Sequence, residues 1–184
     1  MPPLPAAPAP ELVAARVAAL APTLNGAPWA LDLKRSDPIM PLMAAMGAPW
    51  AIVQMVRASG EPNATRTFTL SADGLRDQLV AAGVIANRTE DTAWTWAPFS
   101  RASPVGPQPA CLSLDAEGRL AMVAHNVPKG LVVTSTMEPV VPDADAPNVT
   151  RDVLVVNLTV TDTLGKEVVR LRRIFTRARG GVNA

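Results

Sequence analysis

The sequence predicts a mostly β protein: a closed antiparallel up-and-down β-barrel of about ten strands, with a helix-turn-helix lid after the first strand. Three features predict this fold. After Gly60, many short segments alternate apolar with polar side chains and are separated by turn residues. Two short segments with helical spacing stand between the first alternating segment and the others. The Pro/Ala-rich stretch MPPLPAAPAP comes before all of them and is typical of an extended N-terminal extension.

The composition fits one core-forming domain and narrows its partners. Of the 184 residues 48% are hydrophobic but only 4% are aromatic, and tyrosine is absent, so we expect a core of aliphatic side chains and methionine. A net charge of +1 argues against a nucleic-acid partner, because such a surface needs clustered Lys and Arg. We divide the chain into a tail with a short helix at 1–20 and a β-barrel domain at 21–179. The helix of the tail, ELVAARVAAL, is expected to dock only weakly.

The tetrapeptide GAPW occurs twice, and we interpret the two copies as serving different structures rather than as a repeat. The first copy leads into the segment WALDL, where Trp29, Leu31 and Leu33 alternate with other residues as in a half-buried strand. We expect Trp29 to point inward. The second copy lies between two helical segments and places Trp50 at their elbow.

The two helical segments form the predicted lid. In SDPIMPLMAAMG, Ser36 or Asp37 is expected to cap the first helix and Gly47 to end it. In APWAIVQMVRASG, Gly60 is expected to end the second helix. The apolar stripes of the two helices consist of Ile39, Met43 and Met46 in the first and Ile52, Met55 and Val56 in the second.

The remaining segments predict the rest of the barrel. Turn residues at Asp73-Gly74, at Asp115–Gly118 and near Leu164-Gly165 divide the alternating segments into hairpins. Trp94 and Trp96 share a face, which lies either inside the barrel or on its outer wall. Two stretches, Ser103–Pro109 and Glu138–Pro147, have the composition of loops.

The last segment, EVVRLRRIFTRA, gives the most specific prediction. Leu171, Arg173 and Phe175 share one face of the strand, and Arg170 and Arg172 share the other. If the apolar face looks inward, the Arg173 guanidinium lies inside the barrel, where burial is costly unless a carboxylate pairs with it. The alternative is that the faces exchange near the strand end and Arg173 reaches solvent.

The order of these elements resembles the cytosolic fatty-acid-binding proteins, which are calycin-like barrels covered by a helix-turn-helix. The resemblance runs from Pro22 to Arg177 and rests on NGAPWAL, IMPLMAAMG, EPN, CLSLD and VVRLRRIFTRA taken in order. It implies an intracellular, non-enzymatic carrier that encloses a fatty acid or a similar hydrophobic molecule without a cofactor. Lipocalins, which are related barrels, fit less well because a helical lid comes early in this chain.

The resemblance also implies a binding site. In the resembled family an Arg-x-Tyr pair on the closing strand holds the carboxylate of the fatty acid. The matching positions are Arg173 and Phe175, so the hydroxyl group is missing, and Thr134–Met137 supply no second arginine. This departure leaves apolar or neutral-headed ligands open. The ligand-binding residues that we predict are Arg173, Phe175, Ile39, Met43, Trp50, Met55 and Leu171.

Two other functions stay open at this stage. The chain could be an enzyme or isomerase on a similar barrel, with His125 or Arg173 acting on a small hydrophobic molecule. However, one histidine and one cysteine provide neither a catalytic triad nor a metal site. The third hypothesis is an interaction module whose barrel is filled by its own side chains.

The expected location is the cytoplasm, and the expected state is a monomer that contacts membrane surfaces transiently through its lid. Cys111 stands alone, which suits a reducing compartment. The Asn-x-Thr sites at Asn63, Asn87, Asn148 and Asn157 would suit a secreted protein, but the first residues lack the pattern of a secretion signal. The longest uncharged stretch, Pro38–Val53, is too short and too interrupted to span a membrane.

Overall fold

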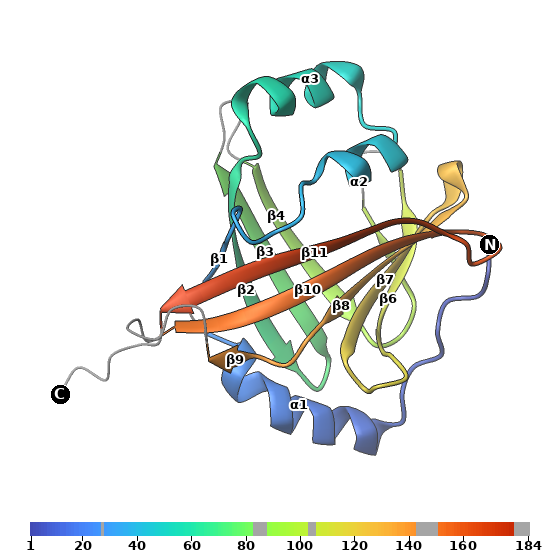
Figure 1. The fold of residues 1–184 in the computed structure, drawn as a ribbon. Coiled ribbons are helices and arrows are strands. Elements are labelled where there is room, and N and C mark those ends of the chain that lie inside the picture. The colour runs from blue at the N-terminus through green and yellow to red at the C-terminus, as the bar shows by residue number, and fades with distance from the viewer. Residues whose placement is uncertain (27, 83–87, 103–105, 143–150, 179–184) are drawn as a thin grey trace.

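The computed structural model describes residues 1–26, 28–82, 88–102, 106–142 and 151–178. A curved antiparallel sheet forms the body, with one helix across one end and two short helices over the opposite end (Figure 1). In chain order the elements are α1 (Pro10–Leu24), β1 (Trp29–Leu31), α2 (Met40–Ala45), α3 (Trp50–Ser59), β2 (Asn63–Ser71), β3 (Gly74–Ala82), β4 (Arg88–Thr95), β5 (Phe99–Arg101), β6 (Gln108–Leu114), β7 (Leu120–Asn126), the 3-10 turn η1 (Val127–Lys129), β8 (Leu131–Met137), β9 (Val141–Pro142), β10 (Arg151–Asp162) and β11 (Glu167–Ala178).

The sheet confirms the predicted strand arrangement but not its closure. Hydrogen-bonded neighbours follow the order β4-β3-β2-β1-β11-β10-β8-β7-β6-β5, and the short β9 pairs with β10. No ladder joins β4 to β5 in the part of the chain that the structure describes, so the prediction of a closed barrel is wrong. The chain bends at Trp96 and Ala97 between these strands, and Pro98 has no N–H to donate to a ladder.

Side chains cross this seam in place of a backbone ladder. Trp94 and Phe99 pack edge to face, with their ring centroids 5.9 Å apart. Arg101 on β5 lies 4.0 Å from Glu90 on β4, and its guanidinium lies over the Trp94 ring. Aromatic contact and ion pairing therefore join the two edge strands.

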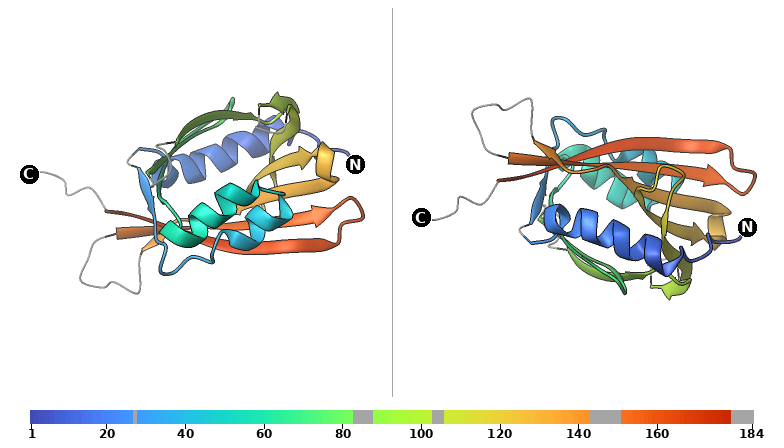
Figure 2. Two further views of the ribbon diagram at one scale, coloured as in Figure 1. Left: turned by 90° about the horizontal axis from the view of Figure 1, so that it is seen from above. Right: turned by 90° about the horizontal axis from the view of Figure 1, so that it is seen from below.

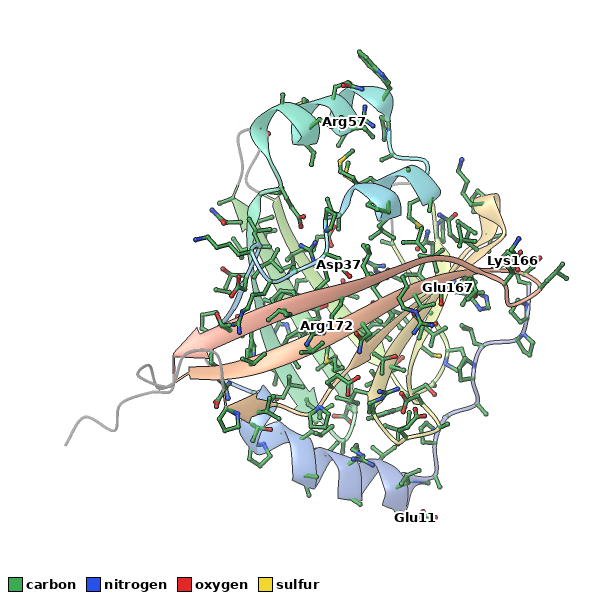
Figure 3. The ribbon with its side chains drawn as sticks, viewed as in Figure 1. Glu11, Asp37, Arg57, Lys166, Glu167 and Arg172 are labelled. Atoms are coloured by element: carbon green, nitrogen blue, oxygen red, sulfur yellow. The ribbon has the colours of Figure 1, made fainter. Side chains whose placement is uncertain are left out.

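The two faces of the closing strands follow the sequence pattern. Leu154 and Val156 on β10 and Phe175 on β11 belong to the main core cluster. Val156 lies opposite Arg173 in the ladder, so Arg173 stands on the inward row. Arg172, on the other row, is exposed (Figure 3). The predicted inward direction of Arg173 is confirmed.

Helix α1 covers the base of the sheet, at the end opposite α2 and α3 (Figure 2). Its Val13 and Leu24 are buried in the core cluster. The helix continues to Leu24, past the predicted limit of the tail at residue 20. The expectation that it docks weakly stays a prediction. The division into 1–20 and 21–179 stays a prediction, and residue 179 lies outside the described residues.

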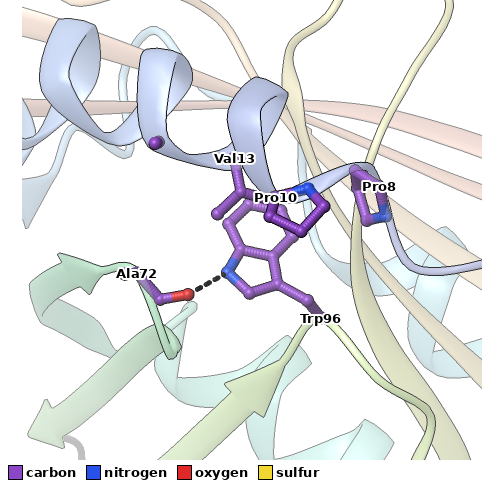
Figure 4. A pocket seen from close by; sticks show the side chains of 6 residues that line it. Pro8, Pro10, Val13, Ala72 and Trp96 are labelled. Carbon is purple, nitrogen blue, oxygen red and sulfur yellow. Dashed lines mark hydrogen bonds between the residues drawn. The ribbon is translucent and has the colours of Figure 1, made fainter.

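The segment before α1 packs along the outside of the sheet. Pro8 and Pro10 lie beside Trp96 at an open groove of about 250 Å³ (Figure 4). The Trp96 Nε1–H donates to the Ala72 carbonyl at the β2–β3 turn. Farther along, Leu4 packs against a small cluster on the outer face of β6 and β7. The segment before α1 therefore packs against the outer face of the sheet at β6 and β7.

The linker from β1 to α2 extends the sheet instead of capping a helix. The Asp37 N–H donates to the Arg172 carbonyl, and the Asp37 carboxylate accepts from the Arg172 N–H at 2.7 Å. Ser36 Oγ accepts from the Ile174 N–H. Helix α2 begins after Ile39 with no side-chain cap, so the predicted capping role of Ser36 or Asp37 is wrong. These groups form hydrogen bonds with the backbone of β11 at positions that β1, which ends at Leu31, no longer reaches.

The lid itself matches the prediction closely. Gly47 and Gly60, at the ends of α2 and α3, have φ values of 66° and 81°, a backbone region that favours glycine. The second GAPW copy lies in the elbow and ends with Trp50, the first residue of α3. Of the first copy, Ala27 lies outside the described residues, and Trp29 is fully buried.

Candidate ligand-binding site

The inward rows of the sheet are tightly packed near α1 and more accessible near the lid. At the base, Leu75 on β3, Met137 on β8 and Leu154 on β10 are buried in the core cluster. Two or more positions along the same rows, Leu79, Val133 and Leu158 are only half-buried. Other inward residues towards the lid, Val160 on β10 and Asn126 on β7, are buried. Because the three half-buried side chains point inward, their residual exposure means that solvent reaches the inner face at the lid end.

The lid helices match this accessible end. Neither α2 nor α3 has a buried residue, although both carry apolar stripes. Ile39 and Met43 are half-buried. Trp50 is 76% exposed and Met55 is 37% exposed. The lid thus covers the opening with apolar side chains that have not packed into a core of their own.

Arg173, which is buried, and Glu61, which is half-buried, form an ion pair beside the start of α2. The Arg173 Nη1–H donates to Glu61 Oε2 at 3.1 Å, and Nη2 contacts Oε1. Arg173 also donates to the Asp37 carbonyl at 2.6 Å. Glu61 in turn accepts from the Ile39 N–H at 3.2 Å. The pair therefore connects β11 with the start of α2 and with the segment between α3 and β2.

A second ion pair lies deeper on the inward rows. Arg66 on β2 donates through Nε to Asp77 Oδ1 on β3 at 3.0 Å. Its guanidinium lies over the rings of Phe68 and Phe175, 5.3 and 5.9 Å from their centroids. This arginine was not predicted, because the second arginine was expected only near Thr134–Met137. The alternation of Arg66 with Phe68 in NATRTFTL was the signal for this inward position.

The predicted site residues are only partly brought together. Arg173, Leu171 and Phe175 lie on the inward row of β11, and all three are buried. Ile39 and Met43 belong to the first lid helix and its N-cap, and both are half-buried. Trp50 and Met55 lie on α3 with much of their surface in solvent, so the structure does not gather them with the others.

The other reactive side chains lie away from this site. His125 is buried on the outer row of β7, because Ala121 and Val123 of that row pack in the outer cluster and the alternate residues pack in the core. Burial lowers the pKa of His125. Burial also raises the pKa of the Cys111 thiol, which weakens it as a nucleophile. The described residues contain no group of three or more potential metal ligands.

The buried tryptophans settle the open question about Trp94 and Trp96. Both belong to the core cluster. Trp94 lies on the inward row of β4, opposite Leu75, whereas Trp96 follows the end of β4 and packs beside Val13 of α1. In the described part of the chain, no helix is long and apolar enough to cross a membrane.

The comparisons with known proteins agree with this architecture at the level of the fold. No family model matches the chain, and no curated protein matches it. A Schistosoma mansoni fatty-acid-binding protein in complex with arachidonic acid has a TM-score of 0.56 and 19% identity, over 86% of this chain and 98% of that one. A fatty-acid-binding protein from Drosophila melanogaster brain tissue has a TM-score of 0.53 and 15% identity, over 84% and 100%.

A third solved structure has the same fold under a different name. It is a secretory abundant heat soluble protein from Ramazzottius varieornatus, with a TM-score of 0.58 and 13% identity, over 82% of this chain and 93% of that one. At such identities the likeness concerns the fold and leaves the ligand undecided. The chain therefore has the fold of the fatty-acid-binding proteins, as its resemblance to that family predicted.

Proposed function

We propose that this protein binds a fatty acid or a similar small hydrophobic molecule beneath α2 and α3, and carries it through the cytoplasm without chemical change. One observation carries the proposal: the inward rows are packed near α1, whereas several of their side chains nearer the lid, Leu79, Val133 and Leu158, are only half-buried, and the lid itself has no buried residue. A hydrophobic molecule in that space would bury apolar surface at about 25 cal/mol per Å².

The residues proposed to contact the ligand come from two sides. Leu171, Phe175 and Arg173 belong to the wall, and Ile39 and Met43 belong to the lid. The thioether of Met43 suits an apolar chain of irregular shape, because methionine side chains adapt readily. The fold supports the proposal by analogy, since a fatty-acid-binding protein of the same fold has been solved in complex with arachidonic acid.

The proposal includes transient contact of the lid with membrane surfaces. Trp50 and Ile52 are exposed at the start of α3, and Arg57 lies in its last turn. A short helix that carries both an exposed aromatic side chain and a cation is suited to the boundary between acyl chains and head groups. We propose that the carrier acts as a monomer, with residues 21–179 as its lipid-binding unit.

The test is to extract the purified protein with organic solvent, analyse the extract by mass spectrometry, and titrate the protein with a neutral fluorescent apolar probe. A stoichiometric hydrophobic molecule, or saturable probe binding at micromolar concentration, is the expected result. An empty protein that does not bind the probe would contradict the carrier function and favour a barrel filled by its own side chains.

A further inference from the structure

Four arginines that face the interior, among those whose side chains the structure describes, have a carboxylate partner. Arg66 pairs with Asp77 and Arg173 pairs with Glu61. Arg101 lies 4.0 Å from Glu90 at the seam. Arg177 lies 3.7 Å from Asp152 at the base. These inward-facing cations are therefore matched by acidic groups of the protein itself.

This matching changes what Arg173 can do for a ligand. The Glu61 carboxylate already accepts from Nη1 and Nη2 of Arg173. A ligand carboxylate would need the same two N–H groups for a bidentate ion pair. A carboxylate entering beneath the lid would either displace Glu61 or be buried as an excess negative charge. Burial of an unpaired charge is strongly unfavourable, so both routes disfavour an anionic head group.

The polar group left unpaired under the lid is uncharged. Asn126, the last residue of β7, follows the inward row of Met122 and Ala124 and is 1% exposed. Its Oδ1 has no hydrogen-bond partner among the described residues. Its Nδ2 contacts only the Met46 Sδ, at 4.0 Å, and a thioether is a weak acceptor.

Asn126 and the ion pair lie at opposite ends of α2. Met46 is the C-cap residue that follows α2, and Ile39, bonded to Glu61, is the N-cap residue that precedes it. Six helical residues span about 9 Å, so the uncharged amide is separated from the charged pair. A ligand head group beside Asn126 would lie beneath the C-terminal end of α2 and away from Arg173.

A hydroxyl group fits this position better than a carboxylate. It donates to Oδ1 as the amide stands, and it accepts from Nδ2 if the amide is turned over. A carboxylate can only accept, so it would need the amide turned with Nδ2 towards it, and it would still be buried there as a charge without a cationic partner. A buried polar atom without a partner in a folded protein calls for a ligand or a water molecule.

On the basis of the proposed carrier function, we propose that the physiological ligand is an uncharged hydrophobic molecule with a hydroxyl group, which bonds to Asn126 beneath α2. Long-chain alcohols represent this class. The ion pair of Glu61 and Arg173 excludes free fatty acids and remains intact when the ligand is bound.

The test compares three probes of one chain length: hexadecan-1-ol, hexadecanoate and hexadecane. Each displaces a neutral fluorescent probe from the full-length protein at neutral pH. The alcohol is expected to bind at least about tenfold more tightly than the acid, because the acid would bury a charge. Equal or tighter binding of the acid would overturn the inference and leave the carrier function standing. Binding of none of the three would overturn both.

Two variants locate the head group. Asn126→Leu is expected to weaken binding of hexadecan-1-ol by about two- to tenfold, the effect of one uncharged hydrogen bond, and to leave hexadecane unaffected. The matched control is Asn157→Leu, because Asn157 stands on the outward row of β10 and donates to Glu138. An unchanged alcohol affinity in a folded Asn126→Leu variant would overturn the inference. If that variant fails to fold, the comparison of the three probes on the native protein still decides.

A third variant tests the exclusion of acids. Glu61→Gln removes the internal carboxylate and frees Arg173, so affinity for hexadecanoate, relative to that for hexadecan-1-ol in the same variant, is expected to rise by at least about tenfold. A Glu61→Gln variant that gains no affinity for the acid would show that the ion pair does not set the ligand class.

Discussion

Glu61 and Arg173 are 112 residues apart in the chain, and their side chains form a two-point ion pair with the carboxylate held on the guanidinium. The pair is poorly accessible to solvent, with side-chain exposures of 17% for Glu61 and 9% for Arg173. Through Ile39 and Asp37 it also reaches the start of the lid. One ion pair therefore links the last strand, the first lid helix and the connection from the lid to β2.

Breaking this pair is expected to destabilise the protein and loosen the lid. Glu61→Gln leaves the buried Arg173 charge without its partner, which costs about 3 kcal/mol of unfolding free energy. Amide hydrogen exchange in α2 should become faster, because the Ile39 N–H loses a charged acceptor. Chemical denaturation and hydrogen exchange measure the two effects.

An exposed pair on the same strand provides the control. Arg170 and Glu167 have side-chain exposures of 67% and 45%, so Glu167→Gln should cost less than about 1 kcal/mol. The double variant Glu61→Gln/Arg173→Met should recover much of the stability lost in the single variant. Equal losses for Glu61→Gln and Glu167→Gln would contradict the role assigned to the buried pair.

Ligand binding is expected to distinguish Arg173 from its neighbour Arg172. Arg173→Ala leaves Glu61 unpaired beneath the lid and should weaken binding of a hydrophobic probe far more than Arg172→Ala, which changes an exposed side chain. Fluorescence titration of the two variants, at a temperature where both are folded, measures the difference. Similar affinities would show that the inward row of β11 does not contribute to the site.

The attachment of α1 to the barrel gives a stability prediction. Before the start of β1, the Asn25 side chain takes the place of a neighbouring strand for β2: it accepts from the Leu70 N–H at 2.7 Å and donates to the Leu70 carbonyl at 3.0 Å. Asn25→Ala removes both bonds and should cost about 1–3 kcal/mol in chemical denaturation. Thr23→Ala, whose hydroxyl makes an exposed local bond, should change stability by less than about 0.5 kcal/mol. A neutral Asn25→Ala would refute the view that this side chain fastens α1.

Acid is expected to destabilise the protein through His125. Burial lowers its pKa below the ordinary value of 6.5, so the unfolded chain takes up a proton before the folded one does. The contribution of His125 to the free energy of unfolding is therefore constant above about pH 6.5, and it falls as the pH decreases from there towards the folded-state pKa. The pKa values of Asp91 and Asp115 are lowered below 3.8, so the loss tied to these carboxyls comes at more acidic pH.

The measurement compares thermal unfolding between pH 7.5 and 5.5 for the native protein and for His125→Phe. The variant removes the only histidine and should show a flatter dependence over this range. An identical slope in both proteins would mean that another group is responsible.

The sequence predicted much of the fold because local patterns determine it. Alternation assigned Trp29 and Arg173 to the inner face, and glycine at 47 and 60 marked the ends of the lid helices. The prediction from sequence failed where a contact with a residue far away in the chain determines the local structure. Ser36 and Asp37 have the residue types of helix caps, but β11 competes for them across more than a hundred residues.

The same limit applies to the candidate site. The inward direction of Arg173 follows from its own strand, whereas its partner Glu61 comes from the lid connection and has no local signature. Asn126 was missed because a single amide at a strand end resembles an ordinary turn residue. Its importance depends on burial and on the unpaired Oδ1, which only the packed structure provides.

The lid is expected to insert Trp50 into lipid bilayers. Trp50 is 76% exposed, whereas Trp29, Trp94 and Trp96 are at most 8% exposed, so tryptophan fluorescence changes on vesicles report mainly on Trp50. Emission should shift to shorter wavelength on vesicles containing anionic lipid, and brominated lipid should quench it. Trp50→Ala should weaken vesicle binding by roughly tenfold or more, since a buried aromatic side chain contributes about 1.5–3 kcal/mol. Leu164→Ala, at the 91% exposed tip of the β10–β11 turn, controls for any exposed apolar residue and should leave binding unchanged. Equal losses in both variants, or no spectral shift in the native protein, would refute a membrane contact made by the lid.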